Sequence, residues 1–231
     1  MARTSSSTDA VEILRHDHRA VEALFRRFER SKSGAERKRL ADRMMRELSI
    51  HAAVEEQHVY PLLRNRLDGE GPKVLVALEE HHLAKLGLSE IERLDASDER
   101  FDAKVHVLIE SVRRHVRDEE RELLPALRRT LTPDELRALG DALARAKEAA
   151  PTRPHPTAPD QPPANLLANA GAAAVDRGRD ALGRGIARVL DRSRGVVEEA
   201  LRRGEVAARQ ARQRISRGIE RAGREVRPDT H

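Results

Sequence analysis

The chain of 231 residues contains no cysteine and no tryptophan, and aromatic residues make up only 2% of it. The lack of cysteine excludes disulfide partners, thiolate metal sites, iron–sulfur clusters and thiol nucleophiles. A metal ion in this protein would therefore need histidine, carboxylate, tyrosine or water ligands. With so few aromatic rings, the core must be built from Leu, Val, Ile, Ala and a few Met and Phe, a composition that favours helices.

Long apolar runs are also missing, since no segment approaches the ~20 residues needed to span a membrane. The opening residues, MARTSSSTDA, lack the apolar segment of a secretory signal. We therefore expect a soluble, cytoplasmic protein. Its formal charge of +5 is unevenly placed: residues 165–231 contain 15 Arg, no Lys and 9 acidic residues, which leaves a slight negative excess for the rest.

Apolar periodicity and helix-breaking residues divide the chain into long helices. We expect an all-α fold, an up-down-up-down bundle of four helices over Ala10–Arg30, Ala35–Leu67, Lys73–Leu94 and Ser97–Thr130. A short fifth helix over Leu136–Ala149 should start at a capping box formed by Thr132 and Glu135.

Four segments follow from this pattern: a disordered N-terminus (1–9), the bundle (10–150), a proline-rich linker (151–163) and a tail rich in Arg, Ala and Gly (164–231). The linker, PTRPHPTAPDQPP, should be extended and semi-stiff. In the tail, aliphatic residues recur every eleven positions from Val175 to Ile219, which predicts a thinly apolar amphipathic helix, weakened by glycines, or a partly disordered segment.

Two stretches, HAAVEEQHVYP (51–61) and HVRDEERELLP (115–125), share one pattern at a spacing of 64 residues. In each, a histidine stands four residues before a glutamate, so His51 and Glu55, like His115 and Glu119, lie about 6 Å apart on one helical face. That face is otherwise apolar, with Met44, Leu48, Val59 and Leu62 continuing the row through His51. Two helices are therefore predicted to present an inward His-x-x-x-Glu pair.

Further histidines fall on the remaining helices. His18 lies on the apolar row of the first helix, and either His81 or His82 can face inward on the third, which periodicity leaves open. We expect His16 and His106 at the surface, and Tyr60 to point away from His51 and pack between helices, unless a bend at Pro61 turns it inward. Residues that could support or replace a ligand are His58, Tyr60, His82, Lys85, Glu56 and Glu120.

Each αα-hairpin then contributes two histidines and one glutamate, the set that a carboxylate-bridged dinuclear site needs. Imidazole with carboxylate suits iron or manganese better than calcium or magnesium, and zinc is chemically compatible. A purely structural bundle is the alternative, but six inward polar residues would be costly without a cation.

These motifs resemble the hemerythrin-like, or HHE cation-binding, family. The resemblance covers residues 10–148 and rests on Leu14-Arg-His-Asp-His18, His51-x-x-x-Glu55-Glu56, Glu80-His81 and His115-x-x-x-Glu119-Glu120. It implies a non-haem di-iron centre, oxo- or hydroxo-bridged, with ligands His18, His51, Glu55, His81, His115 and Glu119. Iron thereby ranks above manganese and zinc.

Lys85 departs from the pattern of the respiratory hemerythrins, which the resemblance indicates carry a further histidine there. This departure opens or changes one coordination position, which water, Tyr60 or His58 could fill. Some bacterial members resemble proteins that handle hydrogen peroxide or nitric oxide in oxidative stress. An open position would fit such chemistry, including peroxidase- or catalase-like turnover, as well as oxygen binding.

Two functions compete at this point. The first is a di-iron protein that binds or turns over dioxygen, hydrogen peroxide or nitric oxide. The second is an iron- or oxygen-responsive interaction protein whose basic tail binds an anionic membrane or nucleic acid. The tail lacks aromatic residues for base stacking, which counts against recognition of single strands.

Overall fold

A computed structural model of the chain describes residues 8–66, 71–158, 165, 169, 171–177 and 179–181. Within these residues all regular structure is helical, and no helix is long and apolar enough to cross a membrane. The chain divides into two units, Met1–Gly178 and Arg179–His231. Most of the predicted tail, including its eleven-residue repeat, lies outside the described residues, and only residues 179–181 of the second unit are described, as helix.

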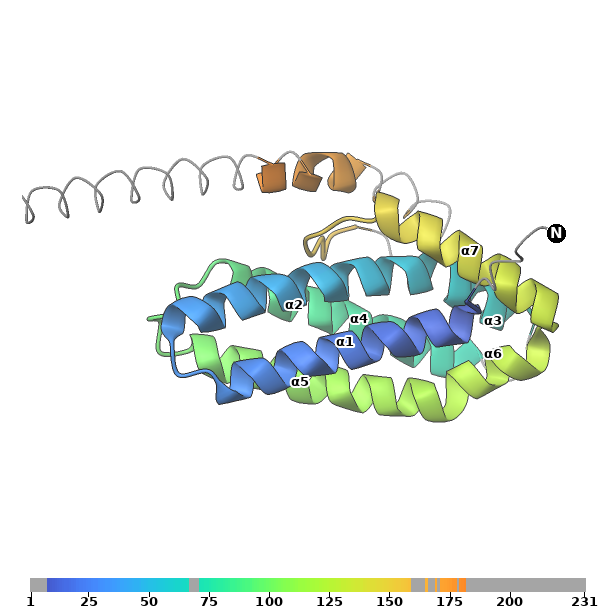
Figure 1. Cartoon of the computed structure of the whole chain (residues 1–231), viewed down its shortest axis with the longest axis horizontal. Coiled ribbons are helices and arrows are strands. Elements are labelled where there is room, and N and C mark those ends of the chain that lie inside the picture. The colour runs from blue at the N-terminus through green and yellow to red at the C-terminus, as the bar shows by residue number, and fades with distance from the viewer. Residues whose placement is uncertain are drawn as a thin grey trace, which may run out of the picture. The chain divides into compact units, whose positions relative to one another are not determined.

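The first unit contains the predicted bundle, which confirms the all-α fold (Figure 1). Its elements are α1 (Ala10–Arg30), α2 (Gly34–Val54), η1 (Glu55–Val59), α3 (Tyr60–Arg66), α4 (Gly71–Glu92), α5 (Phe101–Asp118), η2 (Glu119–Leu123), α6 (Leu124–Thr130) and α7 (Pro133–Ala149). The segments α2–η1–α3 and α5–η2–α6 each form one long helix interrupted by a π-helical turn. The helices α1 and α2 pair as one antiparallel hairpin, and α4 and α5 as the other.

Local capping explains where several helices begin. The Asp9 side chain accepts a hydrogen bond from Glu12 N–H at 2.9 Å and starts α1. Thr132 and Glu135 form the predicted capping box of α7, although that helix begins three residues earlier than expected, at Pro133.

The fourth helix begins later than predicted, at Phe101 instead of Ser97. The Asp95 side chain accepts hydrogen bonds from the backbone and hydroxyl of Ser97, and Asp98 accepts one from the backbone N–H of Arg100. These local turns satisfy the backbone in a non-helical conformation, so the helix starts only after them.

Two large apolar clusters, separated by a polar layer, make up most of the core of the described residues. One cluster, with Leu14, Tyr60 and Leu127, fills the end of the bundle near α3 and α6. The other, with Phe28 and Phe101, fills the opposite end. The helix α7 crosses α1 and α2 near the first end (Figure 1). The residues between the two clusters are therefore held in place from both sides.

Candidate metal centre

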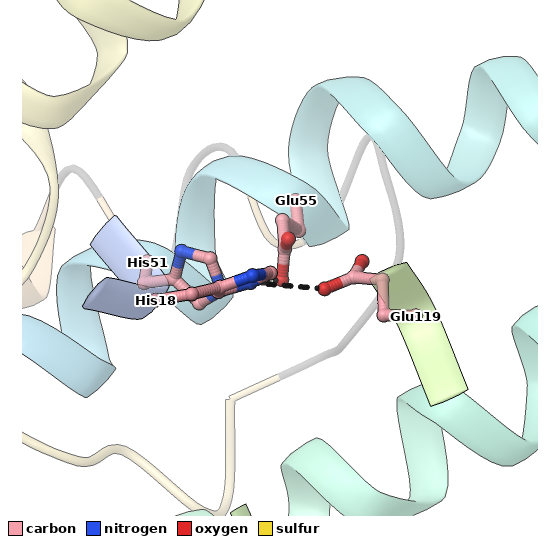
Figure 2. Close-up of side chains that lie close together, drawn as sticks. All are labelled: His18, His51, Glu55 and Glu119. Carbon is pink, nitrogen blue, oxygen red and sulfur yellow. Dashed lines mark hydrogen bonds and ion pairs between the residues drawn. The ribbon is translucent and has the colours of Figure 1, made fainter. Parts of the chain in front are cut away.

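Six side chains with ligand-type atoms converge in the layer between the two apolar clusters. Ligand-type atoms of His18, His51, Glu55 and Glu119 all lie within 4.8 Å of one another, and a second such group contains Glu55, His81 and His115. All six side chains are buried. Figure 2 shows the first group, with the carboxylates of Glu55 and Glu119 pointing toward the two imidazoles. Because Glu55 belongs to both groups, the layer forms two adjoining half-sites.

The π-helical turns place the two glutamates. Glu55 and Glu119 each begin such a turn, in which the backbone N–H of Tyr60 donates to Glu55 O and that of Leu124 to Glu119 O. A proline follows directly in both hairpins, at Pro61 and Pro125. Proline lacks an N–H and its ring clashes with the carbonyl four residues earlier, so a wider turn just before it relieves both problems.

The extra residue in the first π-turn also changes the position of Tyr60. A simple helical wheel pointed Tyr60 away from the site, with a bend at Pro61 that turns it inward as the exception, and the exception holds: its hydroxyl lies 3.2 Å from His81 Nε2 and 3.4 Å from Glu55 Oε2 and Glu119 Oε1. A regular 3.6-residue wheel misplaces every residue after a π-turn. In the second hairpin the equivalent position is Leu124, so the two half-sites differ in this hydroxyl.

The four imidazoles share one orientation, with Nδ1 facing a carboxylate. His18 Nδ1 donates to Glu120 at 2.8 Å, His81 Nδ1 to Glu56 at 3.1 Å, and His115 Nδ1 to Glu80 at 2.9 Å. His51 Nδ1 lies 3.6 Å from Asp17 Oδ2. A proton held on Nδ1 by a carboxylate leaves the lone pair of Nε2 available to a metal ion.

The Nε2 atoms accordingly point into the layer and toward one another. The His18 and His51 Nε2 atoms are 3.2 Å apart, and those of His81 and His115 are 3.1 Å apart. When both protons are on Nδ1, such a contact brings two lone pairs together and gives no hydrogen bond. Two nitrogens bound to one ion at about 2.1 Å and at a right angle would be about 3 Å apart, so the spacing fits a cation between each pair.

Buried oxygen atoms support the same interpretation. Within the described part of the chain, Glu55 Oε1 is shielded from solvent and has no hydrogen-bond partner. Glu119 Oε2 is likewise shielded and accepts no hydrogen bond, and it lies 3.2 Å from His18 Nε2. A buried carboxylate oxygen without a partner is unfavourable unless a cation satisfies it. The donor set of four imidazole nitrogens and two carboxylates therefore fits metal ions such as iron.

Electrostatics in the layer differ from one imidazole to the next. Burial lowers the pKa of His51 to about 4 and also lowers that of His81. Burial, and then the neighbouring Glu119 carboxylate, raise the pKa of Glu55 well above its usual range. For Glu119, His18, His115 and His51 outweigh burial and lower the pKa. At His18, the carboxylates of Glu119 and Glu120 outweigh burial and raise the pKa. His51 and His81 thus offer lone pairs at neutral pH, and Glu55 ionises readily only when a cation is near.

The other histidines and the lysine considered in the sequence analysis lie outside the two ligand groups. Lys85 does not point at the layer's centre; its Nζ donates to Glu56 at 2.8 Å, and Glu56 in turn supports His81. His82 and His58 are half-buried and belong to neither ligand group. His16 and His106 are exposed, as expected.

Two supporting residues were missed by the sequence analysis. Asp17 and Glu80 each precede an inward histidine, His18 and His81, and each faces the imidazole of the other helix in its hairpin. The signal was available as an acid-histidine pair present in both hairpins. The sequence analysis followed one row of inward residues on each helix, and Asp17 and Glu80 lie next to that row, so this pair was overlooked.

A small cavity adjoins the four imidazoles on the side of the second apolar cluster. Its volume is about 40 Å³, and its apolar lining includes Val21, Leu48, Leu88 and Val112. One water needs roughly 10–15 Å³ of such space. The cavity can therefore hold a diatomic molecule or a peroxide beside the layer.

Residues 9–127 match the family described as the hemerythrin HHE cation binding domain. A hemerythrin-like protein of Schizosaccharomyces pombe is 29% identical over 165 residues, which cover 71% of this chain and 81% of that protein. A protein of Nostoc named DNA nickase is 29% identical over 124 residues, covering 54% of this chain but only 35% of that protein.

A crystal structure resembles the fold as well. It contains a hemerythrin HHE cation binding domain-containing protein from Mycobacterium kansasii, with a TM-score of 0.54 and 28% sequence identity. The similarity covers 61% of this chain and 86% of that one. These matches agree with the helical bundle.

Proposed function

Because the chain belongs to the hemerythrin HHE cation-binding family and thus to proteins that bind metal cations, we propose that its metal centre is a di-iron site for a small oxidant. Dioxygen, hydrogen peroxide and nitric oxide are the candidate oxidants. The observation that carries the proposal is the pair of adjoining ligand groups, each with two histidines, which share Glu55. Two ions side by side with a common carboxylate are the arrangement that dinuclear chemistry requires.

The chain's own residues have distinct roles in this proposal. His18 and His51 hold one ion, His81 and His115 the other, and Glu55 and Glu119 lie between the pairs. Iron bound here would supply the electrons needed to bind or reduce the oxidant. The carboxylates behind the imidazoles keep each Nε2 aimed inward, as in other histidine metal sites.

The surroundings favour a small, uncharged substrate. The apolar cavity of about 40 Å³ limits bulk water and admits only a molecule of a few atoms. Lys85 is engaged with Glu56 and so leaves unoccupied the ligand position that a further histidine would fill. The Tyr60 hydroxyl holds a proton beside both carboxylates, and burial, followed by the charges of Glu119 and Glu55, raises its pKa well above the usual range.

Metal content is the first test. Elemental analysis of protein purified without added metals or chelators should find about two iron ions per chain, together with the near-ultraviolet absorption of an oxo-bridged pair. His51→Leu and His115→Leu should each lose at least one ion, whereas His106→Leu, which alters an exposed histidine on α5, should lose none. One zinc ion, or no metal, would remove the redox proposal.

The oxidant can then be identified by rapid mixing of the reduced protein with each candidate. A spectral change that reverses when gas is removed would indicate oxygen binding. Repeated turnover of peroxide or nitric oxide would indicate an enzyme. Absence of a response to all three would leave a metal protein without the proposed activity.

A second candidate function concerns the tail, whose 15 arginines and absence of lysine favour contact with phosphates. We infer from this charge that residues 164–231 bind a polyanion, either duplex DNA or an anionic membrane surface. The name of the Nostoc relative makes DNA a natural probe. Binding to DNA or to anionic vesicles that weakens with salt and disappears on deletion of residues 164–231 would support it; no binding by the intact chain would refute it.

A further inference from the structure

A groove separates α1 from α5 on the surface of the bundle. Its volume is about 880 Å³, far larger than the cavity at the metal centre. The two helices touch much less closely than the helices within either hairpin, which leaves room for it. The volume falls in the range of about 300–1,000 Å³ that is common for sites of small organic ligands.

The lining combines positive charge with an apolar floor. Val21, Phe25, Val112 and Val116 form the floor, and Glu22 and Glu120 are the acidic residues in the lining. Six arginines also line the groove: Arg19, Arg26, Arg27, Arg30, Arg113 and Arg117. The arginines exceed the acids, so the groove attracts anions.

Several of these arginines are already engaged. Arg113 donates to Glu22 at 3.0 Å and to Glu29 at 2.7 Å. Arg26 pairs with Glu22 at 2.9 Å, and Arg30 Nε donates to the Arg26 carbonyl. The carboxylates of Glu22 and Glu29 thus compensate Arg26 and Arg113, whereas the contact of Arg30 with a backbone carbonyl leaves its charge in place.

Arg19 and Arg117 differ from the rest. Both are exposed, and within the described part of the chain neither forms a hydrogen bond or an ion pair. The contacts His18–Glu120 and Glu22–Arg113 set the antiparallel register of α1 and α5. Arg19 and Arg117 fall between these two contacts, at one level of the groove. Two unpaired guanidinium groups therefore flank it from opposite helices.

We propose that this groove binds a small organic molecule bearing a dianionic phosphate group. The phosphate lies between Arg19 and Arg117, because two guanidinium groups match its charge and its oxygen geometry. The apolar part of the molecule lies along the Val21, Phe25, Val112 and Val116 floor. A monoanion would leave one guanidinium uncompensated, and inorganic phosphate would leave the floor uncovered.

The site has a direct connection to the metal centre. Glu120 lines the groove with 38% of its side chain exposed, and it holds His18 Nδ1 at 2.8 Å. A dianion bound between Arg19 and Arg117 would therefore share the groove with the carboxylate that orients a proposed metal ligand. This coupling rests on the proposed function, whereas binding in the groove does not.

Hexyl phosphate is a suitable probe, with inorganic phosphate and 1-hexanol as its two halves. Calorimetric titration of the full chain should show hexyl phosphate binding at least tenfold more tightly than either half. Arg19→Gln combined with Arg117→Gln should weaken binding at least tenfold. Arg43→Gln, which removes an exposed and unpaired arginine from α2, should leave it unchanged.

Two results would overturn the proposal. Equal affinity of the double variant and the native chain would place the phosphate elsewhere, for instance on the arginines of the tail. Equal affinity for hexyl phosphate and inorganic phosphate would show that the floor contributes nothing. Titration of the iron-loaded chain gives a separate readout: tight binding without a change in the visible spectrum would remove the coupling to the metal centre but not the groove site.

Discussion

The ion pair between Lys147 of α7 and Asp17 of α1 links α7 to the metal layer, and its strength can be measured. Lys147 Nζ donates to Asp17 Oδ1 at 2.5 Å, and Asp17 Oδ2 faces His51. The side chains are 28% and 11% exposed, between the surface and the buried case. Exposed pairs contribute about 0.2–1 kcal/mol, and breaking a buried pair costs about 3–5 kcal/mol. We therefore expect Lys147→Met to lower the free energy of unfolding by about 1–3 kcal/mol.

A double-mutant cycle isolates the pair itself. Urea unfolding of the metal-free native protein, Lys147→Met, Asp17→Asn and the double variant should give a coupling energy of about 1–2 kcal/mol. The exposed pair Lys104 and Glu90 serves as a matched control, with an expected coupling below about 1 kcal/mol. A Lys147–Asp17 coupling no larger than the control would refute the reasoning. In the iron-loaded protein, Asp17→Asn should also weaken metal binding, by about 10- to 100-fold.

Three further predictions concern packing, pH and the polar layer. Gly140→Ala should destabilise the protein by about 1–2 kcal/mol in thermal unfolding, because a Cβ there would lie 2.3 Å from the Thr8 carbonyl oxygen. Gly87→Ala should instead stabilise α4 by up to about 1 kcal/mol, because a Cβ there would make only an ordinary contact with Leu108 Cδ1 at 3.8 Å. Arg66 and then Thr132 lower the pKa of Glu135 to about 2. The Glu135 carboxylate therefore contributes its full stabilisation of the fold above its ordinary pKa of 4.5 and loses it as the pH falls toward 2. The difference in melting temperature between the native protein and Glu135→Gln should shrink over that interval. Without metal, the His51→Leu variant should be at least as stable as the native protein, because it removes a buried polar group from the layer. Added iron should stabilise the variant less than the native protein, because one ligand is missing. A large loss of stability in the metal-free variant would contradict this prediction.

Much of the bundle could be predicted because apolar periodicity reflects burial directly. The row through His51 and Glu55 continued into Met44 and Leu48, which pack in the core, so the inward face was correctly identified. The internal repeat added a second half-site without any knowledge of the fold. Periodicity could not separate His81 from His82, because both neighbours share apolar residues on helix α4; the structure buries His81 in the layer and leaves His82 half-buried outside it.

The misplacement of Tyr60 has a physical cause that periodicity cannot include. A π-turn adds one residue to a helix turn, and its location depends on the proline that follows and on the packing that accepts it. The late start of α5 is a similar case, since side chains of Asp95 and Asp98 compete with the helix for backbone hydrogen bonds. Contacts between helices, such as Lys147 with Asp17, depend on three-dimensional docking and leave no regular trace along the chain.

The carboxylates that contact the four imidazole Nδ1 atoms fall into two kinds, and the difference affects how the protein takes up metal ions. Asp17 with His51 and Glu80 with His115 lie within one hairpin each, whereas Glu120 with His18 and Glu56 with His81 join the two hairpins. Each hairpin can thus orient one imidazole, His51 or His115, before the bundle closes. His18 and His81 are oriented only when the two hairpins come together. Metal loading and release should therefore follow the separation of the hairpins, so that the lifetime of the bound ions reports how often the bundle opens.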